Sequence, residues 1–291
     1  MALELARRIG GVVINADSQQ LFADLPILTA QPGPADTAEI PHRLYGVLGA
    51  HEQPSVGRWL ALLTPALEAA RRDGVPALVV GGTGLYLHAL LHGIPEMPDI
   101  PDALRGELRE WAEVVRPGDL HARLAARDPE MAARLQPGDS QRLLRALEVI
   151  EATGRSLIQW QATPRRRPAL PDRTTGLALA PPAAVVSPRI EARLAGMLEA
   201  GAMAEVRGLL TRHADATRLP IGKVHGLREL AAVSEGRLEL DVAKASIAAQ
   251  VRGYAKRQRT WFRHHLPELA WVAEVGASEA AIAIVLQVLR D

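Results

Sequence analysis

The stretch "VPALVVGGTGLYLHALLHG" (residues 75–93) decides the fold class of this chain. A short apolar run is followed by two glycines and then by apolar residues at helical spacing, which predicts a strand, a tight turn and a helix. Another apolar run, over residues 12–16, predicts a second strand with a short helix before it. Strands that alternate with helices indicate a parallel sheet with crossover helices, so we expect an α/β fold.

The middle of the sequence has a different pattern. From about residue 95 the periodicity predicts helices alone, and a loop rich in arginine and proline, "TPRRRP" (residues 163–168), closes this part. The α/β pattern then returns. We therefore expect an α/β core made of residues 1–94 and 171–291, interrupted by a helical insertion of residues 95–170.

Capping signals predict several helix ends. Asp128 stands before a proline, an arrangement typical of an N-cap and a first helical turn, and Gly154 is a suitable C-terminal stop. We expect Ser140 to cap the helix that ends at Gly154, and a later helix to begin at Ser187. Two further helices are expected, over residues 240–265 and 278–290.

The composition excludes several classes of protein. The 291 residues contain no cysteine, which excludes disulfides, thiolate zinc ligands and a cysteine nucleophile. Hydrophobic residues make up 48% of the chain, so a packed core is expected. The sequence contains no signal-peptide pattern and no apolar run of about 18 residues. We expect a cytoplasmic protein without a membrane partner.

A carboxylate and two amides follow the strand of residues 12–16. Asp17, Ser18, Gln19 and Gln20 stand where ligands bind in parallel α/β sheets, at the carboxyl end of a strand. Asp17 is suited to accept a proton from a nucleophile, and a glutamine amide can contact an adenine edge. The alternative is structural, because an Asx turn would close the strand with the same residues.

The glycine turn of residues 81–83 is a second candidate for ligand contact. Gly81 and Gly82 permit close backbone approach, and Thr83 can cap the following helix or offer a hydroxyl. No lysine follows at the spacing of a Walker A loop. A tight strand–helix turn without a ligand explains the same residues.

Two basic segments are candidate binding surfaces. In "SQRLLRALEV" (residues 140–149), helical spacing places Gln141, Arg142 and Arg145 in one sector, opposite the apolar positions. In "GYAKRQRTWFRHH" (residues 253–265), arginine and lysine alternate with aromatic rings as on RNA-binding surfaces. Solvated helix faces are the alternative for both, and the second cluster also complements the dipole of its helix.

In this order the motifs resemble those of the tRNA dimethylallyltransferases, also called tRNA isopentenyltransferases. The resemblance rests on eight segments: "INADSQQLF" (14–22), "PHRLYGV" (41–47), "SVGRW" (55–59), "VVGGTGLYLHALL" (79–91), "DSQRLLRALEVIEATG" (139–154), "RIEARLAGMLEAGAMAEV" (189–206), "KVHGLREL" (223–230) and "YAKRQRTWF" (254–262). It implies transfer of a dimethylallyl group from its diphosphate to N6 of adenosine 37 in tRNA, forming i6A. It also implies a P-loop-type, nucleotide-binding parallel core, a helical insertion that holds the anticodon arm, a Mg²⁺ cofactor and a monomer.

The same resemblance assigns roles to individual residues. It implies that Asp17 is the general base and that Thr83 lies beside the reacting centre. It also implies a set of residues that contact the tRNA: Asp17, Ser18, Gln19, Gln20, Thr83, Arg105, Gln141, Arg142, Leu143, Leu144, Arg145, Lys223, Val224, His225, Gly226, Leu227 and Arg228.

One element of the family is missing from the sequence. The phosphate-binding motif G-x-x-x-x-G-K-[ST] occurs nowhere in the 291 residues, and in the family it precedes the segment that resembles residues 2–8. Either the start codon is assigned too far downstream, or the gene product is shortened and leaves a strand position of the sheet unpaired. A shortened product would be a non-catalytic tRNA-binding remnant. Prenylation of free adenine nucleotides is a further alternative, against which the helical insertion argues.

Overall fold

The computed structural model describes residues 1–171, 174–273 and 279–288. The chain divides into two compact units, each with its own hydrophobic core. The first unit consists of Met1–Leu91 and Pro168–Asp291, and the second of His92–Arg167. These boundaries fall three residues before the expected ones.

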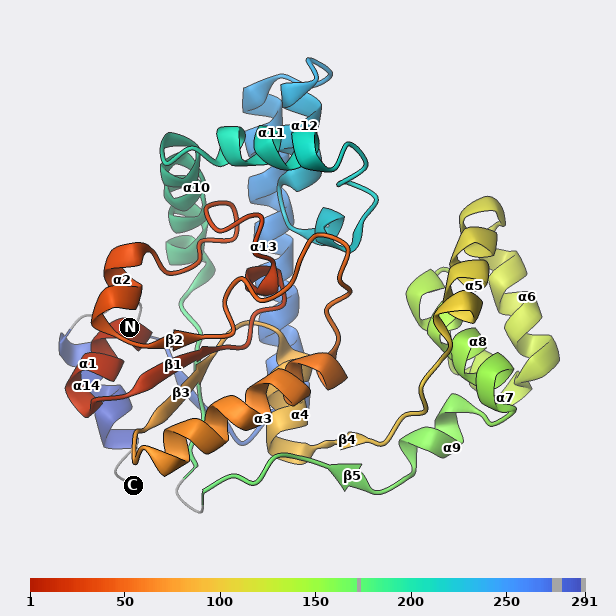
Figure 1. The fold of residues 1–291 in the computed structure, drawn as a ribbon, viewed down its shortest axis with the longest axis horizontal. Helices are drawn as coiled ribbons and strands as arrows, with labels where there is room; N and C mark the ends of the chain where they lie inside the picture. The colour runs from red at the N-terminus through yellow and green to blue at the C-terminus, as the bar shows by residue number, and fades with distance from the viewer. Residues whose placement is uncertain (172–173, 274–278, 289–291) are drawn as a thin grey trace. The chain divides into compact units, whose positions relative to one another are not determined.

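The first unit contains a three-stranded sheet with the order β2-β1-β3 (Figure 1). The strands are β1 (Val12–Asn15), β2 (His42–Arg43) and β3 (Ala77–Val80), and both neighbours run parallel to β1. All four residues of β1 are buried, as expected for the middle strand of a parallel sheet. The predicted α/β fold with a parallel sheet is therefore confirmed.

A second parallel pair joins β6 (Leu177–Leu179) to β7 (Ala270–Val272). Among the residues that the structure describes, β3 pairs only with β1, and β6 pairs only with β7. Val80 on β3 and Leu179 on β6 are correspondingly exposed, although both are large and apolar. Each of these two strands thus presents an edge without a partner strand.

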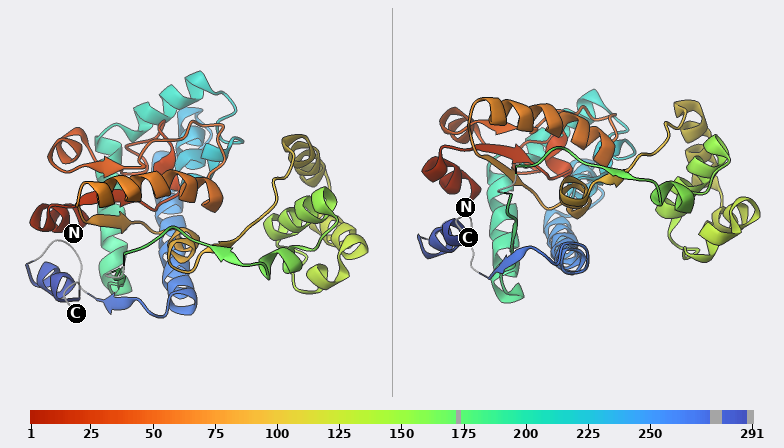
Figure 2. Two further views of the ribbon diagram at one scale, coloured as in Figure 1. Left: turned by 60° about the horizontal axis from the view of Figure 1, so that its bottom comes forward. Right: turned by 90° about the horizontal axis from the view of Figure 1, so that it is seen from below.

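Long helices cover the two faces of the three-stranded sheet. Figure 2 shows α3 (Val56–Arg72) on one face, with α10 (Ala183–Glu199) and α13 (Leu240–His265) on the other. Ser55 caps α3 by accepting a hydrogen bond from the amide of Arg58. This unit also contains α4 (Gly84–His92), α11 (Ala202–Arg212) and α12 (Leu227–Ser234), besides α1, α2 and α14.

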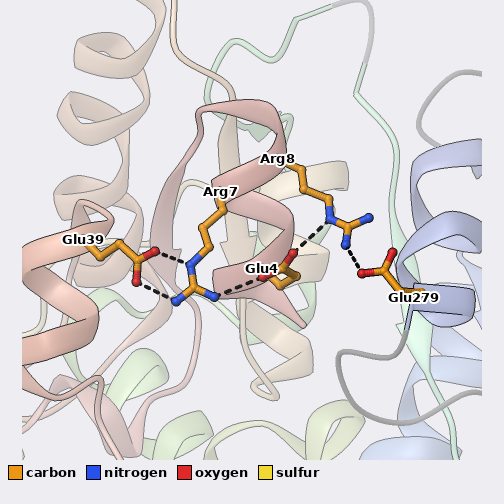
Figure 3. A network of polar contacts seen from close by, with 5 residues as sticks. All are labelled: Glu4, Arg7, Arg8, Glu39 and Glu279. Atoms are coloured by element: carbon orange, nitrogen blue, oxygen red, sulfur yellow. Dashed lines mark hydrogen bonds and ion pairs between the residues drawn. The ribbon is translucent and has the colours of Figure 1, made fainter.

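Ion pairs connect α1 (Ala2–Ile9) to two helices from other parts of the chain (Figure 3). Arg7 pairs with Glu39 at the end of α2 (Pro34–Glu39), and Arg8 pairs with Glu279 at the start of α14 (Glu279–Val288). Both arginines also contact Glu4, at 3.0 Å each. Because both arginines are exposed, these ion pairs contribute little to the stability of the fold, and their main effect is to connect α1 to α2 and α14.

The second unit is a helical cluster entered and left through a short antiparallel pair, β4 (Ile94–Pro95) and β5 (Arg165–Arg166). Its helices are α5 (Asp102–Val114), α6 (Pro117–Arg127), α7 (Pro129–Ala133), α8 (Ser140–Thr153) and α9 (Leu157–Gln161). Leu108, Leu120, Leu124, Leu143 and Leu147 form the centre of its core.

Several predicted helix ends can be compared with the structure. Asp128 caps α7 by accepting a hydrogen bond from the amide of Met131 at 3.1 Å, and Gly154 ends α8 in the left-handed region at φ 66°, as predicted. The prediction for Ser140 is wrong: Asp139 is the N-cap of α8 and accepts from the amide of Arg142 at 3.2 Å. A carboxylate one residue earlier therefore takes the capping role.

The predicted start of α10 is also wrong, whereas α13 runs over the predicted residues 240–265. The helix α10 begins at Ala183, four residues before Ser187, because the alanines that follow Pro182 are strong helix formers. The terminal helix is described over Glu279–Val288, and its predicted ends, residues 278, 289 and 290, lie outside the described residues. Among the described residues, no helix has the length and apolar character needed to cross a membrane.

Candidate active site at the end of strand β1

The chain turns sharply where β1 ends, and a buried asparagine holds the turn. Asn15 Oδ1 accepts from the amide of Asp17 at 2.8 Å, and Asn15 Nδ2 donates to the carbonyls of Asp17 and Leu44 at 2.9 and 3.0 Å. Trp59 of α3 donates its indole N–H to the Asn15 carbonyl at 2.8 Å. The backbone position of Asp17 is therefore fixed by three separate elements of the chain.

The carboxylate of Asp17 closes an Asx turn at the site. Its Oδ1 accepts from the amide of Gln19 at 2.9 Å, and a 3₁₀ helix, Gln19–Leu21, follows. Burial raises the pKa of Asp17 above its ordinary value, while the Gln19 hydrogen bond and the positive charge of Arg193 act in the opposite direction. The Asx turn, which the sequence left open as a structural alternative, is thus present. The carboxyl group that forms it also has a raised pKa.

Phenol rings lie within electrostatic reach of Asp17. Burial, and secondly the charge of Asp17, raise the pKa of Tyr45 to about 12 and raise the pKa values of Tyr86 and Tyr254. Tyr86 stacks on Trp59 with ring centroids 4.7 Å apart. The phenols therefore stay neutral at physiological pH, and the carboxylate lies in a partly apolar environment.

The glycine turn after β3 packs against the Asp17 turn. A Cβ on Gly81 would lie 2.1 Å from the backbone carbon of Ala16, and one on Gly82 would lie 2.0 Å from Nε2 of Gln258. Gln258, on α13, donates to the Gly82 carbonyl at 2.8 Å. The space that these glycines leave is filled by the chain itself, so their presence is explained by packing and not by a ligand.

Thr83 and Ser18 meet at this turn. Thr83 Oγ1 accepts from the amide of Ser18 at 2.9 Å and lies 3.2 Å from Ser18 Oγ, to which it donates. The amide of Thr83 donates to the Ala16 carbonyl at 3.2 Å. The structure therefore brings together three of the predicted site residues, Asp17, Ser18 and Thr83, from the ends of β1 and β3.

The two glutamine side chains are engaged within the protein. Gln20 Nε2 donates to the carbonyls of Thr29 and Ala30 at 3.0 and 2.9 Å, which holds a backbone turn where Ala30 has φ 52°. Gln19 Oε1 accepts from the amide of His225 at 3.0 Å. The sequence predicts that both amides contact an adenine, and in this structure each also has a positioning role within the protein.

The segment of residues 223–228 lies beside this site because Gln19 holds it there. It spans the end of a 3₁₀ helix, Pro220–Lys223, and the start of α12, with Gly226 in the left-handed region at φ 89°. Val224 and Leu227 are buried in the core, so their side chains do not face a ligand. The side chains of Lys223 and Arg228 are exposed.

His225 is the polar side chain of this segment that points inward. Its ring lies 5.0 Å from the ring of Tyr254, and its Nε2 is buried without a hydrogen-bond partner. Burial, and secondly the charge of Arg257, lower the pKa of His225, so its ring is neutral. A buried nitrogen of this kind is suited to a water molecule or a substrate atom.

Sequence reasoning misses Tyr254 and Gln258, although both lie in a segment that it singles out. The pattern of "GYAKRQRTWFRHH" predicts an exposed basic face, and Lys256, Arg257, Arg259 and Arg263 are indeed exposed. Tyr254 and Gln258, spaced i and i+4, instead face inward: Gln258 donates to the Gly82 carbonyl, and the ring of Tyr254 lies beside that of His225. The i, i+4 spacing of two uncharged polar residues is the available signal.

The other predicted site residues belong to the second unit. Arg105 on α5 pairs with Asp102 at 3.4 Å, and Arg142 pairs with Asp139 at 3.3 Å. Gln141 and Arg142 are exposed, Leu144 and Arg145 are half-buried, and Leu143 is fully buried in the core of this unit. The side chain of Leu143 therefore supports α8 and is not available to a ligand.

Hard oxygen donors suitable for Mg²⁺ are present at the first site. In the described part of the chain no three His, Asp or Glu side chains form a metal cage. Mg²⁺ usually keeps several waters and is bound by one or two carboxylates together with substrate phosphates. The Asp17 carboxylate and the paired hydroxyls of Ser18 and Thr83 fit this donor set.

Comparisons with known proteins place this chain in a family. A family model described as IPP transferase matches residues 20–265. The chain is 45% identical over 285 residues to a tRNA dimethylallyltransferase of Methylocella silvestris, covering 97% of this chain and 93% of that protein. It is 48% identical over 282 residues to a tRNA dimethylallyltransferase of a Methylobacterium species, covering 97% and 92%.

Solved structures agree with the sequence comparisons. A full-length tRNA isopentenylpyrophosphate transferase from Bacillus halodurans superposes with a TM-score of 0.67 at 27% identity, covering 99% of this chain and 91% of that one. A eukaryotic dimethylallyltransferase acting on tRNA superposes with a TM-score of 0.78 at 25% identity, covering 99% and 75%. The similarity therefore extends over the α/β unit and the helical unit alike.

Proposed function

The chain belongs to the IPP transferase family and is an enzyme that transfers a dimethylallyl group to tRNA, and we propose that the acceptor is N6 of adenosine 37, with Asp17 as the general base. The donor in this proposal is dimethylallyl diphosphate. The observation that carries it is a partly buried carboxyl group, with a raised pKa, held at the carboxyl end of the central strand.

The proposed step is a nucleophilic substitution at carbon. The lone pair of N6 forms a bond to the first carbon of the dimethylallyl group, the bond from that carbon to the diphosphate oxygen breaks, and diphosphate leaves. The N6 proton passes to the carboxylate of Asp17. Because burial raises the proton affinity of Asp17, it is a stronger base than an exposed aspartate would be.

The adenine must leave its stack to reach Asp17. Enzymes that act on a base turn it out of the nucleic acid into a pocket, at a cost of a few kcal/mol. The unpartnered Nε2 of His225 and the phenol of Tyr254 lie beside the proposed position of the base. They are polar groups that we propose contact it together with Gln19 and Gln20.

The leaving diphosphate requires positive charge and hydrogen-bond donors. We propose that Ser18 and Thr83 hold a Mg²⁺ ion that arrives with the diphosphate, and that Lys223 and Arg228, exposed on the neighbouring segment, contact its oxygens. Such an ion would neutralise charge on the leaving group. The hydroxyls contribute by orienting these groups, as preorganised dipoles do in other active sites.

Arginines that are exposed or half-buried support the proposed binding of the anticodon arm. Arg105, Gln141, Arg142 and Arg145 of the second unit, and the exposed basic residues 256–263 of α13, carry guanidinium, ammonium and amide groups suited to phosphate oxygens. We further propose that one chain acts alone, as a monomer, in the cytoplasm. Sedimentation of the chain with tRNA would measure that stoichiometry.

The function is tested by mass analysis of the nucleosides from tRNA incubated with the chain, dimethylallyl diphosphate and Mg²⁺. We expect a dimethylallyl-adenosine from tRNA that carries adenosine at position 37, and none from the same tRNA with guanosine there. AMP in excess should not compete. Stem–loop binding without any product would contradict the enzymatic proposal, and efficient competition by AMP would contradict the choice of tRNA as acceptor.

A further inference from the structure

The seam between α5 and α8 in the second unit contains a buried acid. Glu148 is 7% exposed in its side chain and lies among the core residues Leu147 and Val149 of α8. A buried carboxylate is costly unless it is paired. It is therefore informative that its partners come from two different helices.

Each oxygen of Glu148 faces a different arginine. Oε2 accepts from Arg145 Nη1 at 3.2 Å, one turn earlier on α8, and Oε1 lies 3.9 Å from Arg109 Nε on α5. Arginine has five N–H donors in a rigid plane, so contact with one oxygen leaves most of the donors of each guanidinium unused. The side chains of Arg109 and Arg145 are 50% and 37% exposed, and so the unused donors can reach solvent or a ligand.

We propose that Arg109, Arg145 and Glu148 form an arginine clamp for a phosphodiester of the bound RNA, with Arg109 as a contact residue and Glu148 as the positioning residue. This proposal rests on the proposed tRNA function. Arg109 lies one helical turn after Arg105, so the clamp extends the basic row of α5 along the seam. Two guanidinium groups oriented by one acid leave a net positive charge facing outward.

A second glutamate on α8 provides the contrast. Glu151 accepts hydrogen bonds from both Nε and Nη2 of Arg123, at 2.8 and 2.9 Å. The guanidinium of Arg123 also lies 4.5 Å from the ring centre of Trp111. The guanidinium of Arg123 is therefore engaged along one edge by Glu151 and on one face by Trp111. Glu151 therefore stabilises a helix contact, whereas Glu148 presents arginine donors.

Because Glu148 is negatively charged, the two possible roles predict opposite changes in RNA affinity when it is neutralised. If Glu148 were only a nearby negative charge, removing it would strengthen the binding of a polyanion. If it positions the two arginines, removing it weakens binding even though the net charge becomes more positive. The variants Glu148→Gln and Glu151→Gln remove the same charge from the same helix, so they form a matched pair.

The experiment measures the affinity of the full chain for anticodon stem–loop RNA at several salt concentrations. We expect Arg109→Gln to weaken binding about three- to tenfold and to reduce the salt slope by about one. Glu148→Gln should weaken binding about threefold or more, whereas Glu151→Gln should stay within about twofold of wild type. Arg134→Gln should also stay within about twofold, because Arg134 is the C-cap of α7, pairs with Glu130 of that helix and lies outside the clamp. Thermal unfolding of each variant checks that it is folded.

Different results would contradict the arginine clamp and the proposed tRNA function. Glu148→Gln that binds as tightly as wild type, or more tightly, overturns the positioning role, and Arg109→Gln with unchanged affinity and salt slope overturns the clamp. If Arg145→Gln weakens binding while both of these variants do not, the tRNA function stands and the clamp fails. A wild-type chain that does not bind the stem–loop refutes the proposed function, and the clamp with it.

Discussion

The Asp17 site and the arginine seam of the second unit are built in opposite ways. Asp17, Ser18 and Thr83 are positioned by the ends of β1 and β3, by α3 through Trp59 and by α13 through Gln258. In the second unit, Arg105, Arg142 and Arg145 pair with residues three positions away on their own helices or at their caps. The first site is assembled from distant parts of the chain, whereas the second is mostly local.

This difference indicates what each region can do. Burial raises the pKa of Asp17, and burial of this kind requires tertiary structure that excludes water. Phosphate binding needs solvated cations on a rigid helix and tolerates exposure. The comparison predicts that substitutions near Asp17 change chemistry and folding together, while substitutions on exposed arginines change binding alone.

The largest expected effect is on the transfer reaction. Asp17→Asn should lower the rate constant for dimethylallyl transfer by about 10²–10⁴-fold, the usual contribution of a general base, while stem–loop affinity stays close to wild type. Asparagine keeps an oxygen that accepts from Gln19, so the turn is preserved. Single-turnover kinetics would measure the rate, and a variant with wild-type turnover would remove Asp17 from the base role.

Glycine substitutions in the two regions should change the free energy of unfolding in opposite directions. Gly81→Ala places a Cβ 2.1 Å from the backbone of Ala16. We therefore expect the free energy of unfolding to fall by about 1–3 kcal/mol or more, and the transfer activity to fall with it. Gly106→Ala on α5 meets nothing within 4 Å and should instead stabilise its helix by up to about 1 kcal/mol. Urea denaturation measures both, and equal effects at the two positions would contradict the contrast.

A smaller effect concerns pH and stability. Because the pKa of Asp17 is raised in the folded state, its ionisation destabilises the protein as pH rises through that value, and the effect vanishes below the unfolded pKa. Asp17→Asn should therefore be more stable than wild type at neutral pH, by about 0.5–2 kcal/mol. The gain should shrink as the pH is lowered. A gain that grows toward acid pH would contradict the raised pKa.

The smallest effect is expected at an exposed arginine. Arg142 is 75% exposed in its side chain, so Arg142→Gln should change the unfolding free energy by less than about 0.5 kcal/mol. Stem–loop affinity should fall about two- to threefold, with a salt slope reduced by about one. Transfer from saturating tRNA should be unchanged. A large loss of turnover at saturation would show that this face takes part in the chemistry.

Part of the site could be predicted from the sequence because short-range signals carry it. Asp17 follows a β-branched run, and Thr83 follows a glycine pair after another such run, so the order of the elements alone predicts that both lie at the same edge of a parallel sheet. The family resemblance and the α/β fold also rest on local motifs. The positioning roles of Gln19 and Gln20 could not be predicted, because their partners, His225, Thr29 and Ala30, are set by the tertiary fold.

The sequence by itself determined the alternation of strands and helices, the helical insertion pattern, most helix ends and the residue types suited to proton transfer and phosphate contact. Periodicity and capping depend on neighbours within a few residues, and so a linear pattern contains them. Only the tertiary structure decided which carboxyl group is buried, that α13 packs Tyr254 and Gln258 against the glycine turn, and that Glu148 bridges two helices. Burial and contacts between distant elements depend on the whole packed chain, because no local window of residues specifies what lies across the core.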